Sequence, residues 1–127
     1  MKIKLTSVLV DDQHKALKFY TEVLGFVKKQ EIPLGKAKWL TVVSPDGPED
    51  IELLLELSDN PAAKTFQAAL RKQGIPLTAF AVDDTQREYD RLKRLGVLFR
   101  KEPTKTGPTI IAVFEDTCGN LIQLYQG

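Results

Sequence analysis

Hydrophobic and polar positions alternate at the start of the chain and then change to a helical spacing. Between Ile3 and Val10 the alternation predicts a strand with one face formed by Thr6, Val8 and Val10 and the other by Leu5, Ser7 and Leu9. From Ala16 to Leu24 the apolar residues recur every three or four positions, which predicts a helix. Asp11 or Asp12 can cap its first turn, and Gly25 can end it.

Three further strands are expected before residue 58. The apolar stretches are Phe26 to Ile32, Lys38 to Ser44 and about Asp50 to Leu57, separated by turn residues at Pro33-Leu34-Gly35 and Pro45-Asp46-Gly47-Pro48. The first part of the chain therefore has the predicted order β-α-β-β-β.

The second part repeats this order. Val10-Asp11-Asp12 returns as Val82-Asp83-Asp84, and Leu24-Gly25 returns as Leu95-Gly96. The predicted elements are a strand at Thr78 to Val82, a helix at Thr85 to Leu95, a strand at Leu98 to Glu102, a loop at Pro103 to Pro108, and strands at Thr109 to Phe114 and Leu121 to Tyr125. Such a duplication predicts one domain built from two modules, with any site in the groove that they share.

The segment between the modules is expected to be a short helix over Ala62 to Lys72. Asn60 can cap it, Pro61 suits its first position and Gly74 can end it. Its apolar stripe is modest: Ala62, Phe66, Ala69 and Leu70. The helix can serve as a mobile lid or as a packed linker, and we favour the linker. The predicted organisation is a single domain over 1–127, with module one at about 1–57, the connector at about 58–76 and module two at about 77–127.

Composition narrows the classes of partner. Lys and Arg number 18 against 17 Asp and Glu, so no strong net field favours nucleic acid or an anionic membrane. A single cysteine, Cys118, excludes an internal disulfide, and the chain shows neither a secretory signal pattern nor an apolar run long enough to span a membrane. We expect a cytoplasmic protein.

The duplicated pattern resembles a known family. The residues that carry the resemblance are the two Val-Asp-Asp endings, Phe19-Tyr20, Val23-Leu24-Gly25-Phe26 and Asp116-Thr117-Cys118-Gly119-Asn120. In this order they are similar to the vicinal oxygen chelate superfamily, which includes glyoxalases, bleomycin resistance proteins and extradiol dioxygenases. The resemblance covers essentially the whole chain. It implies an α+β fold of two tandem βαβββ modules that form a partly closed, barrel-like sheet around a shared cup, and a homodimer.

The resemblance also implies where a divalent metal is held in enzymes of this superfamily. The matching positions here are Leu5, Glu56, Leu77 and Gln123. Two leucines stand where histidines are usual, and one carboxylate with one amide is a weak set for a transition metal. We therefore expect no metal centre and no cofactor, with a divalent metal as the alternative. His14 is interpreted as a surface residue, and Cys118 lacks a second histidine that could activate it.

The faces that carry these positions predict a largely apolar ligand site. The expected ligand-binding residues are Leu5, Ser7, Trp39, Leu54, Glu56, Leu77, Ala79, Gln123 and Tyr125. Leu5 and Leu77 can instead close the cup or lie at a dimer seam, and Trp39 can be simple core. In apolar surroundings the pKa of Glu56 would rise, as a general acid or base requires, although Glu56 can equally reach solvent or pair with a lysine. A metal-free catalyst would use Glu56 as the base and Gln123 or Tyr125 as a hydrogen-bond donor.

Three functions compete at this point. The favoured hypothesis is a glyoxalase or bleomycin-resistance-like protein that binds a small organic molecule in its cup without a metal. The alternative is a divalent-metal-dependent lyase, isomerase or dioxygenase, so the sequence leaves open whether the protein is an enzyme. The third is an interaction module whose cup is filled by its own side chains.

Overall fold

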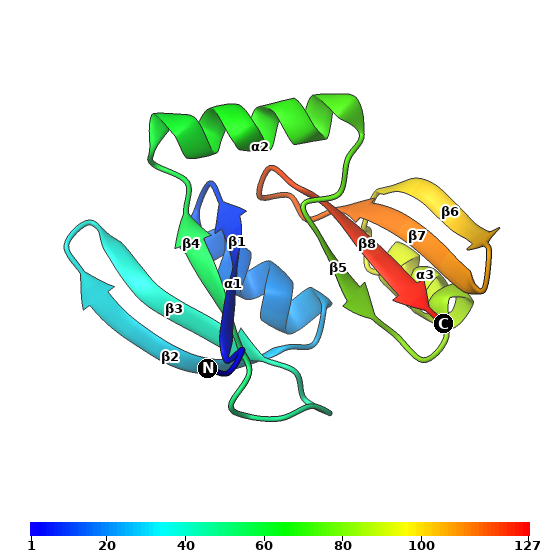
Figure 1. The fold of residues 1–127 in the computed structure, drawn as a ribbon, viewed down its shortest axis with the longest axis horizontal. Coiled ribbons are helices and arrows are strands. Elements are labelled where there is room, and N and C mark those ends of the chain that lie inside the picture. The colour runs from blue at the N-terminus through cyan, green and yellow to red at the C-terminus, as the bar shows by residue number, and fades with distance from the viewer. The chain divides into compact units, whose positions relative to one another are not determined.

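The computed structural model describes residues 1–127, which fall into two compact units, Met1–Thr65 and Phe66–Gly127. Figure 1 shows the first unit from blue to green along the chain and the second from green to red. No helix combines the length and the apolar character needed to cross a membrane.

The first unit contains a mixed sheet with one helical segment between its first two strands. Its elements are β1 (Leu5–Val10), α1 (Gln13–Lys18), the π-helical turn η1 (Phe19–Val23), β2 (Val27–Leu34), β3 (Ala37–Val43) and β4 (Glu52–Leu57). The strand order is β1-β4-β3-β2, with β1 parallel to β4 and the other neighbours antiparallel.

The second unit repeats this arrangement. After the connecting helix α2 (Pro61–Gln73) come β5 (Thr78–Ala81), α3 (Thr85–Arg94), β6 (Phe99–Thr106), β7 (Thr109–Glu115) and β8 (Leu121–Gln126). Its strand order, β5-β8-β7-β6, is that of the first sheet, again with one parallel pair. The predicted α+β class and the two βαβββ modules are confirmed, with the strands in two separate four-stranded sheets.

Each sheet buries one face against its own helix. In the first unit Val8, Val10, Val42 and Leu55 are fully buried, and α1 contacts β3 and β4. In the second unit α3 contacts β6, β7 and β8, and the buried residues on that side include Tyr89, Leu92, Phe114 and Ile122. Because alternate residues of a strand point to opposite faces, the remaining residues define a face opposite α1 and a face opposite α3.

The ends of the helices follow the expected local chemistry. Of the two candidates for the first cap, Asp12 is the one that accepts a hydrogen bond, from the Lys15 backbone N–H at 3.0 Å. Asp84 accepts the equivalent bond from the Arg87 N–H at 3.0 Å. Asn60 Oδ1 accepts from the Ala62 N–H at 2.8 Å, as predicted for the start of α2. Gly25 has φ of +91°, the left-handed conformation expected of the residue that ends the first helix.

One sequence-based expectation about the elements is wrong. The loop predicted at Pro103 to Pro108 is largely strand, because β6 continues to Thr106 with register shifts on either side of Lys101. Proline is tolerated there because β6 is an edge strand that does not need every backbone N–H for pairing. In the connecting helix α2, Phe66 is 51% exposed and the buried residue is Gln67.

Candidate functional site

The predicted ligand residues of the first unit lie on the face opposite α1. The parallel register of β1 and β4 sets Leu5 beside Glu52, Ser7 beside Leu54 and Leu9 beside Glu56. Leu5, Ser7 and Glu56 are exposed, whereas Leu54 is buried. Trp39 is half-buried and pairs with Ile32 of β2. The structure thus brings these residues onto one surface, as the alternation predicts.

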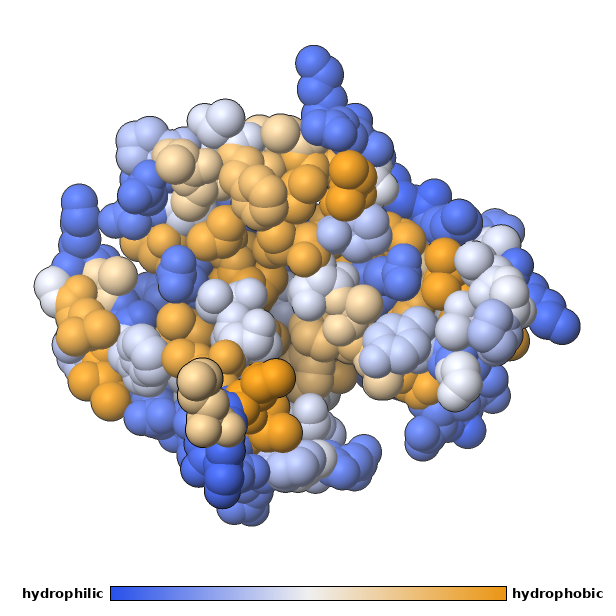
Figure 2. Space-filling model, in the orientation of Figure 1, coloured by the Kyte–Doolittle hydropathy of each residue, from blue (hydrophilic) through white to orange (hydrophobic).

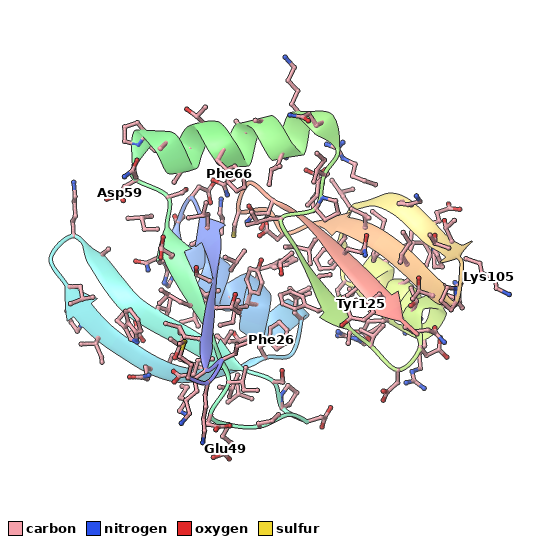
Figure 3. All side chains as sticks on the ribbon, viewed as in Figure 1. Phe26, Glu49, Asp59, Phe66, Lys105 and Tyr125 are labelled. Carbon is pink, nitrogen blue, oxygen red and sulfur yellow. The ribbon has the colours of Figure 1, made fainter.

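The predicted residues of the second unit lie on the face opposite α3. Ala79 pairs with Gln123 and Ala81 pairs with Tyr125 across the parallel β5 and β8 strands. Gln123 also pairs with Val113 of β7. Leu77 lies just before β5, where its backbone N–H donates to the Leu121 carbonyl at 2.9 Å. Tyr125 is 39% exposed and lies near the end of β8 (Figure 3).

A cavity of about 500 Å³ opens on this second face. The residues that line it are Gly74, Pro76, Arg100, Lys101, Ile111, Val113, Leu121 and Gln123. Its volume falls within the roughly 300–1,000 Å³ typical of small-molecule sites. Apolar side chains of β7 and β8 form part of the wall, and two cations and one amide supply polar groups. Of the predicted ligand residues, Gln123 is the one in this lining.

An ion-pair network joins α2, β6 and β7 in the second unit. Glu115 pairs with Arg71 of α2, and its other oxygen accepts from Arg100 Nε at 3.1 Å. The hydrogen bond from Arg71 and the neighbouring guanidinium of Arg100 lower the pKa of Glu115 below its ordinary value of 4.5. Glu115 is therefore ionised at neutral pH and holds Arg100 at the edge of the cavity.

In the first unit, the carboxylate of Glu52 accepts two side-chain hydrogen bonds. It accepts from Thr41 Oγ1 at 2.7 Å and from Gln30 Nε2 at 2.6 Å, and Lys29 Nζ lies 3.9 Å away. The bond from Thr41, then that from Gln30 and the charge of Lys29, lower the pKa of Glu52. Glu56, which the sequence favours as a catalytic carboxylate, is exposed, in agreement with the alternative that it reaches solvent.

The residues at the metal positions of the family do not fit a metal. Leu5 and Leu77 have no donor atoms, and Glu56 and Gln123 offer one carboxylate and one neutral amide. No group of three or more His, Cys, Asp or Glu side chains is arranged to hold a metal ion. His14 is exposed next to the Asp12 cap, as expected of a surface residue.

A buried polar cluster anchors α2 to the turn before β8. Gln67 Nε2 donates to the Cys118 carbonyl and to Asn120 Oδ1, both at 2.9 Å, and Asn120 Nδ2 donates to Asp116 Oδ2 at 2.7 Å. Asp116 and Cys118 are fully buried. The turn residues are thus part of the protein interior, and the burial of Cys118 gives no support for a nucleophilic role.

Sequence reasoning missed Arg100, Lys101 and the Gln67 cluster, as well as the hydrogen bonds that Glu52 accepts. The charged residues Arg100 and Lys101 resemble any solvated pair in the sequence, and the irregular register that sets them at a cavity has no sequence signal. Gln67 lies between Phe66 and Ala68 in α2. Its partners at Cys118 and Asn120 are too far away in the sequence to give a signal.

The fold and the site can be compared with those of known protein families. A sequence model of the Glyoxalase/Bleomycin resistance protein/Dioxygenase superfamily matches residues 2–124, so the chain belongs to this superfamily.

Relatives within the superfamily share nearly the whole chain. The uncharacterized protein YurT of Bacillus subtilis strain 168 is 56% identical over 126 residues, which are 99% of each chain. The crystal structure of UcmS2 is 32% identical, with a TM-score of 0.84 over 98% of this chain and 97% of that one. The crystal structure of TnmS3, an antibiotic binding protein from Streptomyces sp. CB03234, is 30% identical, with a TM-score of 0.76 over 99% of this chain and 95% of that one.

Proposed function

We propose that the protein binds a small organic molecule in the cavity opposite α3 and does so without a divalent metal. The observation that carries this proposal is the cavity of about 500 Å³ with a mixed apolar and polar lining. Ile111, Val113 and Leu121 offer contact area to an apolar ligand body. Gln123 can both donate and accept a hydrogen bond, which would orient the ligand.

The comparisons support a binding role at the level of the superfamily. TnmS3 is described as an antibiotic binding protein, and the family includes bleomycin resistance proteins. The first-unit residues Leu5, Ser7, Trp39, Leu54 and Glu56 stay predicted ligand residues, and so do Leu77, Ala79 and Tyr125. The role of Glu56 as a catalytic base also stays a prediction.

A thermal-shift screen tests the binding function. The panel consists of small aromatic and drug-like compounds, because a ligand at about 100 times its Kd adds roughly 2.7 kcal/mol to stability. Ile111→Trp should fill the cavity and abolish the shift produced by any hit. Ile51→Trp is the matched control, since Ile51 is 46% exposed and lies outside the cavity lining. No hit across a broad panel, or hits that survive Ile111→Trp, would contradict the proposal.

Elemental analysis tests the metal-free part of the proposal. The alternative is a divalent-metal-dependent lyase, isomerase or dioxygenase, which needs more donor atoms than Glu56 and Gln123 supply. We expect the purified protein to contain less than stoichiometric nickel, zinc, iron and manganese. One equivalent of any of these, lost together with ligand binding in a Glu56→Ala variant, would establish the alternative.

We also propose that the protein is a homodimer. Edge strand β2 carries three exposed apolar side chains, Val27, Ile32 and Leu34, and an exposed edge of this kind favours pairing with another chain. Figure 2 shows apolar atoms, in orange, at the β2–β3 hairpin and along α2, and mostly hydrophilic atoms around β6. Light scattering should give twice the mass of the chain, and a monomer at all concentrations would refute this proposal.

A further inference from the structure

The cavity opposite α3 has an unbalanced charge. Its lining contains the two cations Arg100 and Lys101 and no aspartate or glutamate. The whole chain is nearly neutral, with 18 basic and 17 acidic residues, so this local excess does not reflect the composition. A cavity lined by charges of one sign raises the local concentration of ligands of the opposite sign.

An irregularity in β6 sets both cations at the cavity. The register of β6 against β7 shifts between Phe99 and Lys101, so one extra residue is inserted at this point. In a regular strand neighbouring side chains point to opposite faces, whereas at a β-bulge two consecutive residues oppose one partner residue. Lys101 pairs with Val113, and the Arg100 guanidinium reaches Glu115 on the same face.

The neighbouring acid does not cancel these charges. Glu115 is shared between Arg71 and Arg100, so one carboxylate faces two guanidinium groups. Arg100 uses its Nε for this contact, and the fork of a guanidinium has further N–H donors. The Lys101 ammonium takes part in none of the ion pairs of the chain. It is therefore available to a ligand.

We propose that the ligand of this cavity is an organic anion, with Lys101 and Arg100 as the residues that select its charge. This inference rests on the proposed binding function of the same cavity. The ligand has an apolar body that contacts Ile111, Val113 and Leu121, and a carboxylate, sulfonate or similar group that pairs with the two cations. A neutral ligand leaves the ammonium without a partner, and a cationic ligand is repelled.

A matched pair of fluorescent probes tests the inference. Anilinonaphthalene sulfonate is an aromatic anion, and phenylnaphthylamine is the same ring system without the sulfonate. Both are titrated into the unmodified protein and into its Lys101→Gln and Arg100→Gln variants. We expect the anionic probe to bind more tightly than the neutral one. Lys101→Gln should weaken the affinity for the anionic probe by about threefold to tenfold and change the affinity for the neutral probe by less than about twofold.

Lys105→Gln is the control for the loss of one positive charge. Lys105 lies on the same strand but outside the cavity lining, and its side chain extends beyond the β6–β7 hairpin (Figure 3). It should leave the affinity for both probes unchanged. Salt provides a second readout, because about 1 M salt shortens the screening length to about 3 Å and should remove most of the preference for the anion.

The outcomes separate this inference from the proposed function. Equal affinities for the two probes, with no effect of Lys101→Gln, would overturn the selection of anions and leave a binding cavity in place. If Lys105→Gln weakens the binding of the anionic probe as much as Lys101→Gln does, the selection of anions would also be overturned, since the effect would then come from net charge. If neither probe binds, this inference fails, and the proposed function then depends on the broader panel of compounds. If Ile111→Trp leaves both affinities intact, the proposed function of the cavity fails as well.

Discussion

Glu115 links stability to pH at the scale of a single residue. Its side chain is 16% exposed and contacts Arg71 and Arg100, and the hydrogen bond from Arg71 and the charge of both arginines hold its pKa below 4.5 in the folded protein. In the unfolded chain the pKa returns to its ordinary value. The stability from this group is therefore present above about pH 4.5 and is lost as the pH falls through the folded pKa.

We expect Glu115→Gln to lower the free energy of unfolding by about 1–2 kcal/mol near pH 7, because two guanidinium groups lose a charged partner. The difference from the unmodified protein should shrink near pH 3. Urea unfolding at both pH values measures this effect, with the exposed Glu22→Gln as the control. A cost that stays constant down to pH 3 would contradict the assignment. The Glu115→Gln variant should still lose some stability in acid. Lys38 and Lys28 lower the pKa of Glu31 to about 2, and the pKa of Glu52 is also lowered, so both groups lose favourable contacts when they are protonated.

Gly119 is a second residue whose role is set by geometry. Its φ is +100°, and a Cβ added there would lie 2.7 Å from Gln67 Nε2. Gly119→Ala should therefore destabilise the protein by about 1–3 kcal/mol through backbone strain and displacement of Gln67. Gly35→Ala is the matched control, since Gly35 has φ of +60° with nothing within 4 Å of the added atom. Thermal or urea unfolding of both variants should show the larger loss at Gly119, and equal losses would refute the clash.

Individual site residues could be predicted from the sequence only where alternation is regular. Leu5 and Ser7 follow the pleat of β1, and the pairing of Ala79 with Gln123 agrees with the expected faces. Lys101 and Arg100 could not be predicted, because their exposure to the same cavity depends on the register shift in β6. The hydrogen bonds of Glu52 could not be predicted either, because its partners Thr41 and Gln30 come from two other strands.

At the scale of elements, the start of α3 allows a test of its capping residue. Asp84 Oδ1 accepts from the Arg87 N–H at 3.0 Å and satisfies a donor in the first turn of α3. Asp84→Ala should destabilise the protein by about 1 kcal/mol, as is typical for loss of a cap. Asp83→Ala, next to it and exposed, should have little effect. Chemical unfolding compares the two, and an equal cost at both positions would contradict the assignment of the cap.

The order of elements was predictable because each has a local signal. Capping residues, glycines and period changes gave β1, α2, α3 and the segment of α1 with η1 close to their observed bounds. The end of β6 could not be predicted, because a proline such as Pro103 normally interrupts a strand. It is tolerated here because β6 is an edge strand. The contact that fixes α2, from Gln67 to the turn at Cys118, joins residues far apart in sequence.

At the scale of the whole molecule, the duplication was sufficient to predict two βαβββ modules. The equal strand orders of the two sheets confirm that prediction, and the family model matches residues 2–124. The function is less accessible from sequence, because the superfamily fold supports both catalysis and binding. The account rests on the chemistry at particular positions. Leu5 and Leu77 stand where the resemblance implies histidines in metal enzymes, and two cations line a cavity beside Ile111 and Val113.

Isothermal titration of a screened ligand, before and after dialysis against EDTA, tests the central claim most directly. If the cavity binds an organic molecule without a metal, the Kd and a stoichiometry of one ligand per chain should be the same in both titrations. Heat of binding that disappears after EDTA and returns with added nickel or zinc would contradict the account.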